Sequence, residues 1–232
     1  MMKELLIITN LTVTAGNKTL VDRVSLSVPQ GKIVAVAGAS GSGKTTIGLS
    51  VLRLLPAALK IKQGNIIFEG QDLLGLSREE MRQRRGARMG MVFQEPLSAF
   101  DPLFTIGQQI DEVLAAHTKL SRQERYKKVL ETLSEVELPD PGRAYQSYPH
   151  QLSGGMRQRA MVAQAIVCGP SLVIADEPTS SLDVTLQVKI MGLFDRLRKK
   201  NISILLISHD LEMIKHLADE TVLIERSPEA KQ

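Results

Sequence analysis

The stretch from residue 33 to residue 52 reads IVAVAGASGSGKTTIGLSVL. Its first part, Ile33–Ala37, is a continuous apolar run, which predicts a strand buried on both faces. Its last part belongs to a predicted helix over Thr45–Leu55. The segment that joins them, Gly38–Thr45, matches the phosphate-binding pattern G-x-x-x-x-G-K-[ST]. A strand, a glycine-rich loop and a helix in this order predict an α/β fold with an anion site where the helix begins.

The residue types of this loop suit a bound phosphate. The closely spaced glycines Gly38, Gly41 and Gly43 let consecutive backbone N–H groups turn toward a phosphate without a Cβ clash. Lys44 can neutralise charge on the β- and γ-phosphates, and Thr45 can place its hydroxyl on Mg²⁺. The alternative is a glycine-rich turn that fits the pattern by chance. The strand before the loop and the helix after it disfavour that alternative.

Outward from this loop, apolar runs of strand length alternate with helical stretches. Such alternation predicts an α/β domain with a mainly parallel sheet. The further runs are Met91–Phe93, Leu172–Ala175, Ile202–Ile207 and Thr221–Ile224, and the further helical stretches of this part are Val184–Lys199 and Leu211–Ala218.

Two other parts of the chain depart from this alternation. Residues 5–29 predict strands joined by a turn at Gly16-Asn17, as an N-terminal antiparallel β part. Between Gln94 and Gly155 the strand pattern disappears, and Thr105–Ala116 and Arg122–Val136 read as helices. We therefore expect a helical subdomain inserted into the α/β domain.

The run LVIADE at residues 172–177 ends a predicted strand with two carboxylates. Asp176 at the strand tip can hold the shell of a Mg²⁺ ion. Glu177, one residue on, can take a proton from an attacking water. The alternative is a strand that ends in solvated acids, which is common. A phosphate loop in the same chain disfavours it.

Two shorter motifs are weak when each is taken alone. Ser153-Gly154-Gly155 stands at the start of a helical run and is a second candidate anion site. An ordinary serine cap with flexible glycines explains the same residues. His209 follows the apolar run that ends at Ile207, at the edge of a parallel sheet where ligands bind. A lone histidine is more often structural than catalytic.

Composition narrows the class of protein. The net charge is +4, and aromatic residues make up 3% with no tryptophan, so a stacking surface for single-stranded nucleic acid is not expected. The single cysteine, Cys168, excludes an internal disulfide and fits a reducing compartment. No apolar stretch approaches the roughly 18 residues of a membrane span. If the protein works at a membrane, other chains must cross it.

The order of these motifs resembles the ATP-binding subunit of ABC transporters. The motifs are the phosphate loop, Gln94, LSGGM at 152–156, LVIADEP at 172–178, SSLD at 180–183 and SHD at 208–210. The resemblance covers essentially the whole chain. It implies one ABC ATPase domain over residues 1–232, with the ATPase core at 1–93 and 156–232 and the helical subdomain at 94–155.

The resemblance implies a role for each matching residue. Two such chains are expected to hold two ATP molecules head to tail, so that ATP binding closes the dimer and hydrolysis opens it. The resemblance assigns the phosphates to Gly38, Ser40, Gly41, Ser42, Gly43, Lys44, Thr45 and Thr46, and Mg²⁺ to Thr45, Gln94 and Asp176. It makes Glu177 the general base and His209 the sensor of the γ-phosphate. Ser153, Gly154 and Gly155 are expected to contact the nucleotide of the partner subunit, with Asp183 at the dimer interface.

A narrower resemblance is to the oligopeptide, dipeptide and nickel importers. It rests on Gln94–Pro102 (QEPLSAFDP), on Met156–Arg159 (MRQR) and on Leu54-Leu55-Pro56. In that branch the segment after Gln94 receives a helix of a membrane subunit. The expected partners are membrane-spanning permease subunits, an identical or related ATPase subunit and, indirectly, an extracytoplasmic solute-binding protein. The expected location is the cytoplasmic face of the inner membrane, as a peripheral subunit.

Three rival functions stay open at this point. The first is a non-transport ABC ATPase that acts as a clamp on nucleic acid or the ribosome, although such proteins resemble tandem or coiled-coil chains. The second is the ATPase of an exporter, which the segment after Gln94 disfavours. The third is a catalytically silent partner in a heterodimer, which Glu177, His209 and the complete Ser153-Gly154-Gly155 element disfavour. The cargo cannot be named from this chain.

The chain departs from the family in two places. The family stacks adenine on an aromatic residue ahead of the phosphate loop, at the position that we align with Ala15, yet no Phe, Tyr or Trp precedes Phe68. The importer branch normally also continues well past the last strand, whereas here Glu225-Arg226-Ser227-Pro228 leads straight to Gln232. We expect any role of that tail to be missing.

The absent N-terminal aromatic predicts weak ATP affinity and poor discrimination between ATP and GTP. Stacking of a base on an aromatic side chain contributes about 1–3 kcal/mol. Ala15→Tyr should therefore tighten ATP binding. Dissociation constants for ATP and GTP, measured on both proteins by titration calorimetry, check this. A strong preference of the unchanged chain for ATP would contradict the prediction.

Overall fold

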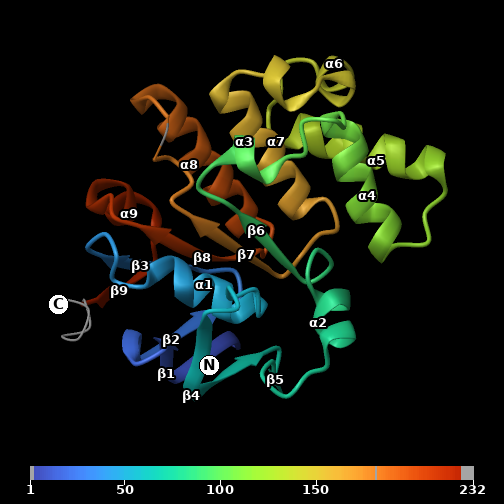
Figure 1. Cartoon of the computed structure of the whole chain (residues 1–232). Helices are drawn as coiled ribbons and strands as arrows, with labels where there is room; N and C mark the ends of the chain where they lie inside the picture. Colours follow the sequence, from blue (N-terminus) through green and yellow to red (C-terminus); the bar gives the residue numbers. More distant parts are fainter. Residues whose placement is uncertain (1–2, 181, 226–232) are drawn as a thin grey trace. The chain divides into compact units, whose positions relative to one another are not determined.

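The computed structural model describes residues 3–180 and 182–225 (Figure 1). Ser181 and Arg226–Pro228, which the sequence analysis names, lie outside the described residues. The chain divides into two compact units, Met1–Arg82 with Leu197–Gln232, and Gln83–Arg196. The predicted subdomain at 94–155 falls within the second unit, and its boundaries stay a prediction.

An antiparallel sheet in the order β2-β1-β4-β5 forms the N-terminal part of the first unit (Figure 1). Strands β1 and β2 pair up to Ala15 and Lys18, so the chain turns at Gly16-Asn17 as predicted. Gly16 has φ 57°, a left-handed conformation that glycine adopts without steric cost. The strands are β1 (Glu4–Ala15), β2 (Lys18–Pro29), β4 (Leu59–Phe68) and β5 (Gln71–Asp72).

Strand β4 is the element that the sequence pattern does not predict. Most of its length is partly exposed, and only Ile66 and Phe68 are buried. At its centre Gly64 has φ 107°, and a Cβ there would lie 2.7 Å from the Leu11 Cα in β1. The glycine lets two strands approach closely where their ladder is irregular, and it interrupts the alternation by which a strand is recognised.

Three parallel strands lie side by side in the first unit, and two of them, β3 (Ile33–Gly38) and β8 (Ser203–Ser208), are buried. Strand β3 pairs with β8 on one side and with β9 (Glu220–Ile224) on the other. Every residue of β8 and all but the last of β3 are buried, as expected for parallel strands that are apolar throughout. The helices of this part are α1 (Lys44–Leu52) and α9 (Leu211–Leu217).

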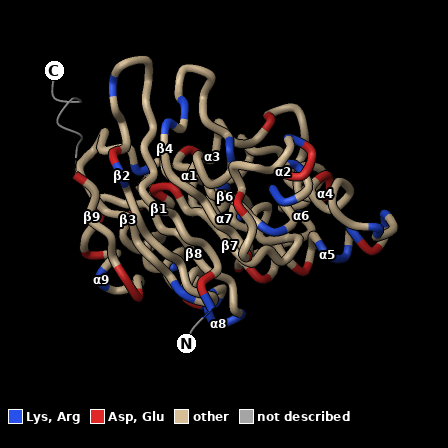
Figure 2. Tube along the Cα trace, turned by 90° about the horizontal axis from the view of Figure 1, so that it is seen from below, with Lys and Arg blue, Asp and Glu red and all other residues tan. Residues whose placement is uncertain are grey.

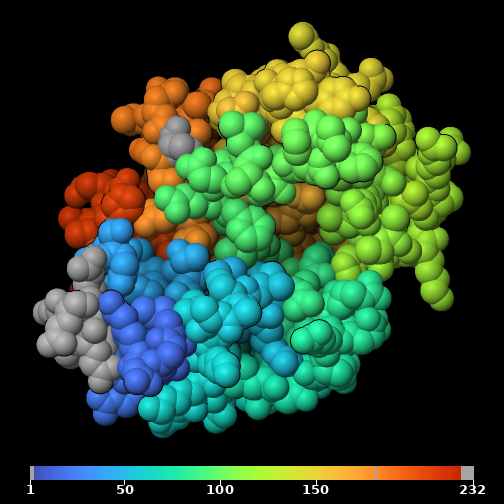
Figure 3. All heavy atoms as spheres, viewed as in Figure 1, coloured from blue at the N-terminus to red at the C-terminus, as the bar shows by residue number. Residues whose placement is uncertain are grey.

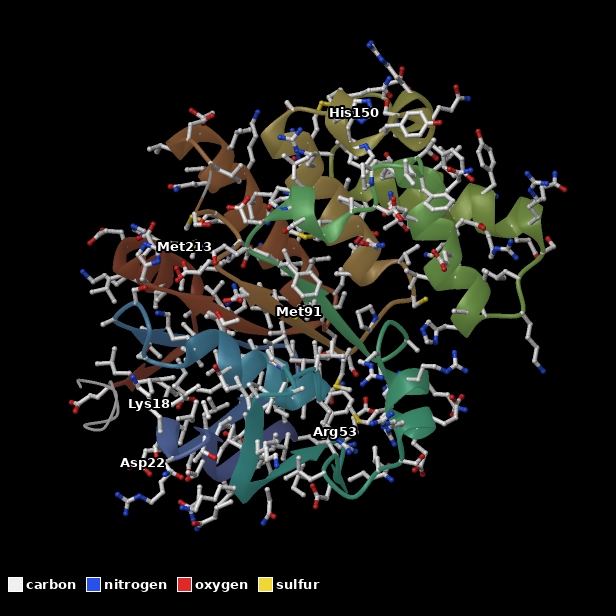
Figure 4. The ribbon with its side chains drawn as sticks, in the orientation of Figure 1. Lys18, Asp22, Arg53, Met91, His150 and Met213 are labelled. Carbon is white, nitrogen blue, oxygen red and sulfur yellow. The ribbon has the colours of Figure 1, made fainter. Side chains whose placement is uncertain are left out.

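Helix α1 is shorter than predicted. It ends at Leu52 rather than Leu55, because Arg53 adopts the left-handed conformation with φ 52° and ψ 43°. The Arg53 guanidinium donates hydrogen bonds to the backbone oxygens of Leu73, at 3.1 Å, and of Leu76 (Figure 4). These long-range bonds hold the chain in its turn, and a local helical pattern cannot reveal them.

The second unit combines two parallel strands with a set of helices. Strands β6 (Met89–Val92) and β7 (Leu172–Asp176) pair in parallel, and a Cβ on Gly90 would collide with the Ala165 backbone oxygen of α7. The glycine therefore allows close packing of β6 on α7. Two helices are shared between the units: α2 (Arg78–Arg84) begins in the first unit, and the last residues of α8 (Val184–Lys199), from Leu197, belong to it. The other helices of the second unit are α3 (Pro96–Ala99), α4 (Ile106–His117), α5 (Arg122–Glu135), α6 (Pro141–Gln146) and α7 (Gly154–Ile166).

Local sequence signals set where the helices of the second unit begin. Thr105 with Gln108 and Ser121 with Glu124 form capping boxes at the starts of α4 and α5. Positive and negative residues are interspersed along α5, as on a solvated helix (Figure 2). Within residues 3–180 and 182–225, no helix has the length and apolar character that crossing a membrane requires.

Asp219 ties together three segments of the first unit. Its carboxylate accepts hydrogen bonds from the Ile33 backbone N–H at 2.9 Å, from Lys32 Nζ at 3.0 Å and from Arg198 at 3.2 Å. Burial works to raise the pKa of this carboxyl group, but the three hydrogen bonds and the charge of Arg198 outweigh it and lower the pKa. The ionised form therefore stabilises the fold.

Asp219→Asn should lower the free energy of unfolding by about 1 kcal/mol at neutral pH, since the partly exposed carboxylate is screened by water. Because the pKa is lower in the folded state, this stabilisation is present above the unfolded pKa and disappears as pH falls through the folded pKa. Urea unfolding of both proteins from neutral pH to about pH 3 measures the difference.

The matched control is Asp22→Asn. Asp22 also pairs with an arginine, Arg23, at 3.3 Å, but the two side chains are 40% and 73% exposed (Figure 4). The control should change the free energy of unfolding by less than about 0.5 kcal/mol. An Asp219→Asn effect that stays constant down to acid pH would contradict the linkage.

Candidate functional site

The phosphate loop lies in the first unit, between the end of β3 and the first turn of α1. Gly41 and Gly43 have φ 77° and 89°, in the left-handed region that favours glycine. A Cβ on Gly43 would also lie 2.7 Å from the Leu20 backbone oxygen and from Val21 Cγ2 in β2. Both conformation and space therefore require glycine here, and the path of the loop is fixed by its surroundings.

The donors of this loop fit an anionic phosphate. Lys44 is almost buried, and its ammonium donates hydrogen bonds to the Gly38 oxygen at 2.8 Å and to the Ala39 oxygen at 3.0 Å. The Ser42 hydroxyl is buried and has no hydrogen-bond partner within residues 3–180 and 182–225. Gly43 caps α1 without a side chain, so the N–H groups of the first turn are not capped by a side-chain oxygen. A buried cation, a buried hydroxyl and this helix start together suit the phosphates of a nucleotide.

His209 reaches the same end of the first unit as the loop. Ala37 of β3 is in register with Ser208 of β8. Gly38 comes directly after Ala37 and His209 directly after Ser208, so the two residues lie at the same end of these strands. The turn at His209 is held by hydrogen bonds. The Ser208 hydroxyl accepts from the Asp210 N–H at 3.0 Å, and Asp210 caps α9 by accepting from the Met213 N–H at 3.0 Å. The predicted loop and the predicted histidine are thus neighbours across two strands.

The carboxylates lie in the second unit, at the end of β7. Asp176 and Glu177 are 3% and 9% exposed, so both are largely shielded from water. Val92 of β6 is in register with Ala175 of β7, which places Gln94 and Asp176 at the same edge of this strand pair. Gln94 and the two carboxylates therefore lie at or just after the ends of neighbouring strands, at one edge of the unit.

Glu177 has a backbone conformation that is uncommon for its residue type. Its φ is 46°, in the left-handed region. The turn is held by the Ser180 N–H and hydroxyl, which donate to the Glu177 oxygen at 3.2 Å and 3.1 Å. Such backbone conformations occur frequently at functional sites, where the surrounding structure holds them in place.

Ser153, Gly154 and Gly155 form the start of α7. The Ser153 hydroxyl accepts from the Met156 N–H at 3.4 Å, so the serine is the helix cap. A Cβ on Gly155 would lie 2.8 Å from Leu186 Cδ1 in the first turn of α8, so close packing requires this glycine. Gly154 faces open space instead. The element combines one glycine needed for packing with a second that leaves the backbone accessible.

Asp183 has a local structural function in addition to its predicted one. Its carboxylate accepts a hydrogen bond from the Leu186 N–H at 3.0 Å and caps α8. Since Leu186 packs against Gly155, the starts of α7 and α8 are neighbours within the second unit. Asp183 and the Ser153–Gly155 element are therefore brought together.

The predicted residues fall into two sets, one in each unit. The first unit holds Gly38, Ser40, Gly41, Ser42, Gly43, Lys44, Thr45, Thr46 and His209, and the second holds Gln94, Ser153, Gly154, Gly155, Asp176, Glu177 and Asp183. Sequence reasoning missed the residues that hold the turn after Glu177, namely Ser180 and the pair Gln187–Thr179, in which the Gln187 amide donates to the Thr179 oxygen at 3.2 Å. The only sequence signal for them is their position directly after the acidic pair.

The sequence of this chain is similar to those of several known transport ATP-binding proteins. The family described as ABC transporter matches residues 21–180. The dipeptide transport ATP-binding protein DppD of Bacillus subtilis is 42% identical over 96% of this chain and 68% of its own length. DppD of Escherichia coli is 41% identical over 88% and 63%, and the oligopeptide transport ATP-binding protein OppD of Bacillus subtilis is 40% identical over 90% and 59%. The chain thus spans about three fifths to two thirds of the length of these relatives.

Solved structures share the fold over nearly the whole chain. The dimeric structure of MJ0796, a bacterial ABC transporter cassette, has a TM-score of 0.84 at 27% identity and covers 95% of this chain and 94% of its own. MJ0796 in a post-hydrolysis state with ADP and Pi gives the same TM-score and identity, with 96% of each chain covered. The predicted fold is confirmed: an α/β cassette with an N-terminal antiparallel sheet, a five-stranded parallel sheet and a helical subdomain. By the match over residues 21–180 and by its similarity to DppD, this chain belongs to the ABC transporter family.

Proposed function

We propose that this chain is the ATP-binding and ATP-hydrolysing subunit of an ABC importer that takes up peptides through separate membrane subunits. The observation that carries the proposal is the similarity to dipeptide and oligopeptide transport ATP-binding proteins over 88% to 96% of this chain. The phosphate loop and the buried carboxylates support the ATPase part. Nickel uptake, the other cargo of the branch, stays a prediction.

The phosphate loop binds the nucleotide. Lys44 moves its ammonium from the oxygens of Gly38 and Ala39 toward the β- and γ-phosphates, and the Ser42 hydroxyl gains the acceptor that it lacks. The loop N–H groups and the start of α1 orient the triphosphate. Because close packing of Gly43 against Leu20 and Val21 of β2 holds the loop in its path, little conformational entropy is lost when the nucleotide binds.

Mg²⁺ fits the remaining oxygen donors. The Thr45 hydroxyl, the Gln94 amide oxygen and the Asp176 carboxylate are hard ligands of the kind that Mg²⁺ prefers. Bound Mg²⁺ supplies positive charge that offsets the charge of the phosphates. Asp176 is only 3% exposed, and a buried carboxylate is stabilised by a nearby cation.

Glu177 acts as the general base for water. Its burial and the left-handed turn of its backbone hold the carboxylate directly after the β7 strand. The carboxylate takes a proton from the attacking water, and His209 orients the γ-phosphate through its ring N–H. Positioning and charge stabilisation account for most of the catalysis in phosphoryl transfer.

Two subunits complete each nucleotide site. The exposed Ser153 and the open space at Gly154 leave the start of α7 available to a second chain. Ser153 and Gly155 then contact the γ-phosphate of the nucleotide held by the partner, with Asp183 at the interface. MJ0796 is dimeric in its solved structure, which supports a dimer here, with an identical or a related second subunit.

The segment after Gln94 is the surface that we assign to the permease. Phe93, Leu97, Leu103 and Phe104 are exposed by 39%, 52%, 78% and 50%, which is unusual for large apolar side chains so close in sequence. This segment, coloured green, lies on the visible face in Figure 3. The subunit would act at the cytoplasmic face of the membrane, and a solute-binding protein outside would deliver the cargo. A clamp on nucleic acid or the ribosome is the alternative function.

Glu177→Gln should keep nucleotide binding and lower hydrolysis at least about 100-fold, because a general base contributes 10²–10⁴-fold. The closed dimer should then persist with ATP.

Lys44→Ala should instead weaken ATP binding by about 10- to 100-fold through loss of the charged contact. Phosphate release and nucleotide titration measure the two effects. Lys127→Ala, at an exposed lysine of α5, is the control that should change neither. Full turnover by Glu177→Gln would show that another group is the base.

The transport function predicts which proteins co-purify. The tagged chain, extracted from native membranes in mild detergent, should bring two multi-spanning membrane proteins with it. Leu103→Glu should reduce their recovery, whereas Leu211→Glu, at an exposed leucine of α9, should not. Mass spectrometry identifies the partners. Recovery of ribosomal or DNA-bound proteins, with no membrane protein, would replace the importer by the clamp.

A further inference from the structure

An exposed pair of aromatic rings lies just before the Ser153–Gly155 element. The rings of Tyr148 and His150 are stacked, with centroids 5.7 Å apart and planes at 13° to each other. Tyr148 is 39% exposed and His150 is exposed. Figure 4 places His150 at the surface of its unit, close to α6. The whole chain has three tyrosines, five phenylalanines and no tryptophan, so a stacked pair at the surface calls for an explanation.

The backbone around the two rings is held by hydrogen bonds. The Tyr148 N–H donates to the Gln151 side chain at 2.8 Å, and the Ile106 N–H donates to the Ser147 oxygen at 2.9 Å. Arg157 of α7 donates to the Leu152 oxygen at 2.6 Å. The rings are therefore presented by an ordered turn fixed to the start of α7. Little side-chain and backbone entropy remains to be lost when a flat ligand stacks on them.

The position of the pair relates it to a nucleotide held by a partner. His150 and Tyr148 precede Ser153 by three and five residues, so the chain keeps them within at most about 18 Å of it. In the proposed function, Ser153 lies at the γ-phosphate of the nucleotide bound to the second subunit. The base of that nucleotide is the flat group for which the pair is a candidate contact. No aromatic residue before Phe68 offers this base a stacking surface in its own subunit.

We propose that Tyr148 and His150 of one copy of this chain stack on the adenine of the ATP held by the phosphate loop of a second copy. The inference rests on the proposed function, because it needs the head-to-tail dimer. The flat faces of tyrosine and imidazole suit a purine face. Stacking across the dimer makes the base contribute to closure of the dimer and leaves the binding of ATP to a single subunit unaffected.

The test uses the full chain with Glu177→Gln, in which ATP is not consumed, and measures the ATP concentration at which dimers form by analytical ultracentrifugation. Tyr148→Ala with His150→Ala should raise that concentration about tenfold, as expected for loss of base stacking. ATP affinity of the monomer, measured in dilute protein, should stay within about twofold. Tyr148→Phe with His150→Phe keeps two flat rings and should dimerise like the parent.

Tyr126→Ala is the matched control. Tyr126 is 43% exposed and also has a ring partner, Tyr145, with centroids 4.8 Å apart. It lies on α5, away from the Ser153–Gly155 element in the sequence. Its loss should leave the ATP concentration for dimerisation unchanged, which separates a stacking effect from a general cost of removing a surface aromatic.

A second arm replaces ATP by ribose 5′-triphosphate, which has no base. The parent and the double alanine variant should then behave alike, since the pair has nothing to stack on. A difference that persists without the base would show a purely structural effect and overturn the inference. Dimerisation with ATP that is insensitive to the double alanine change would overturn it as well, while leaving the proposed function in place. Absence of any ATP-dependent dimer of the Glu177→Gln chain would overturn the inference, which needs a second copy of this chain, whereas the proposed function with a related second subunit would stand.

Discussion

The backbone contact between β3 and its neighbours sets the geometry of the first unit. Gly38 at the end of β3 is in register with Ile224 of β9, and a Cβ on Gly38 would collide with the Ile224 oxygen. On the other side, β3 is in register with β8 up to Ser208. The phosphate loop leaves the sheet from this point, so its direction depends on a contact that only glycine permits. The phosphate loop, α1 and His209 all take their positions from the three parallel strands β3, β8 and β9.

The main physical constraint in the second unit is the burial of two carboxylates. Asp176 is the last residue of a strand with no exposed residue and Glu177 follows it, and a charge in such a place is costly unless it is paired or hydrogen-bonded. In the proposed function, a cation beside Asp176 stabilises that buried carboxylate, and Glu177 serves the attacking water. The φ of 46° at Glu177 turns its backbone out of the strand conformation. Two adjacent acids would then have different roles.

The sequence is informative about the elements whose signals are local. Continuous apolar runs give β3, β7 and β8, and α8 begins and ends where the pattern predicts, at Val184 and Lys199. The phosphate loop is recognisable because its glycines are needed by the backbone itself. The fold class could be predicted because buried strands and helices each have a characteristic spacing of apolar residues along the sequence.

The remaining features depend on contacts between distant segments. Strand β4 cannot be recognised in the sequence because Gly64 interrupts its alternating pattern. The glycine is needed because the strand passes close to Leu11 of β1 at this point. The end of α1 is set by bonds from Arg53 to the loop after β5, and Asp219 reads as an ordinary acid although it ties Ile33, Lys32 and Arg198 together. Likewise, the stacked rings of Tyr148 and His150 cannot be inferred from two residues spaced by one proline. Pattern reasoning stops where a residue acts through a partner far along the chain.

The absence of an early aromatic residue and the presence of the Tyr148–His150 pair have one energetic consequence when taken together. A subunit that stacked adenine by itself would hold ATP tightly before its partner arrived, and that interaction would be the same in the open and closed states. An interaction equal in two states cannot shift the equilibrium between them. Moving the base contact to the second subunit makes it a property of the closed dimer alone. In the proposed dimer the same stacking energy would favour closure, and weak binding of ATP to the monomer would couple ATP to dimer formation.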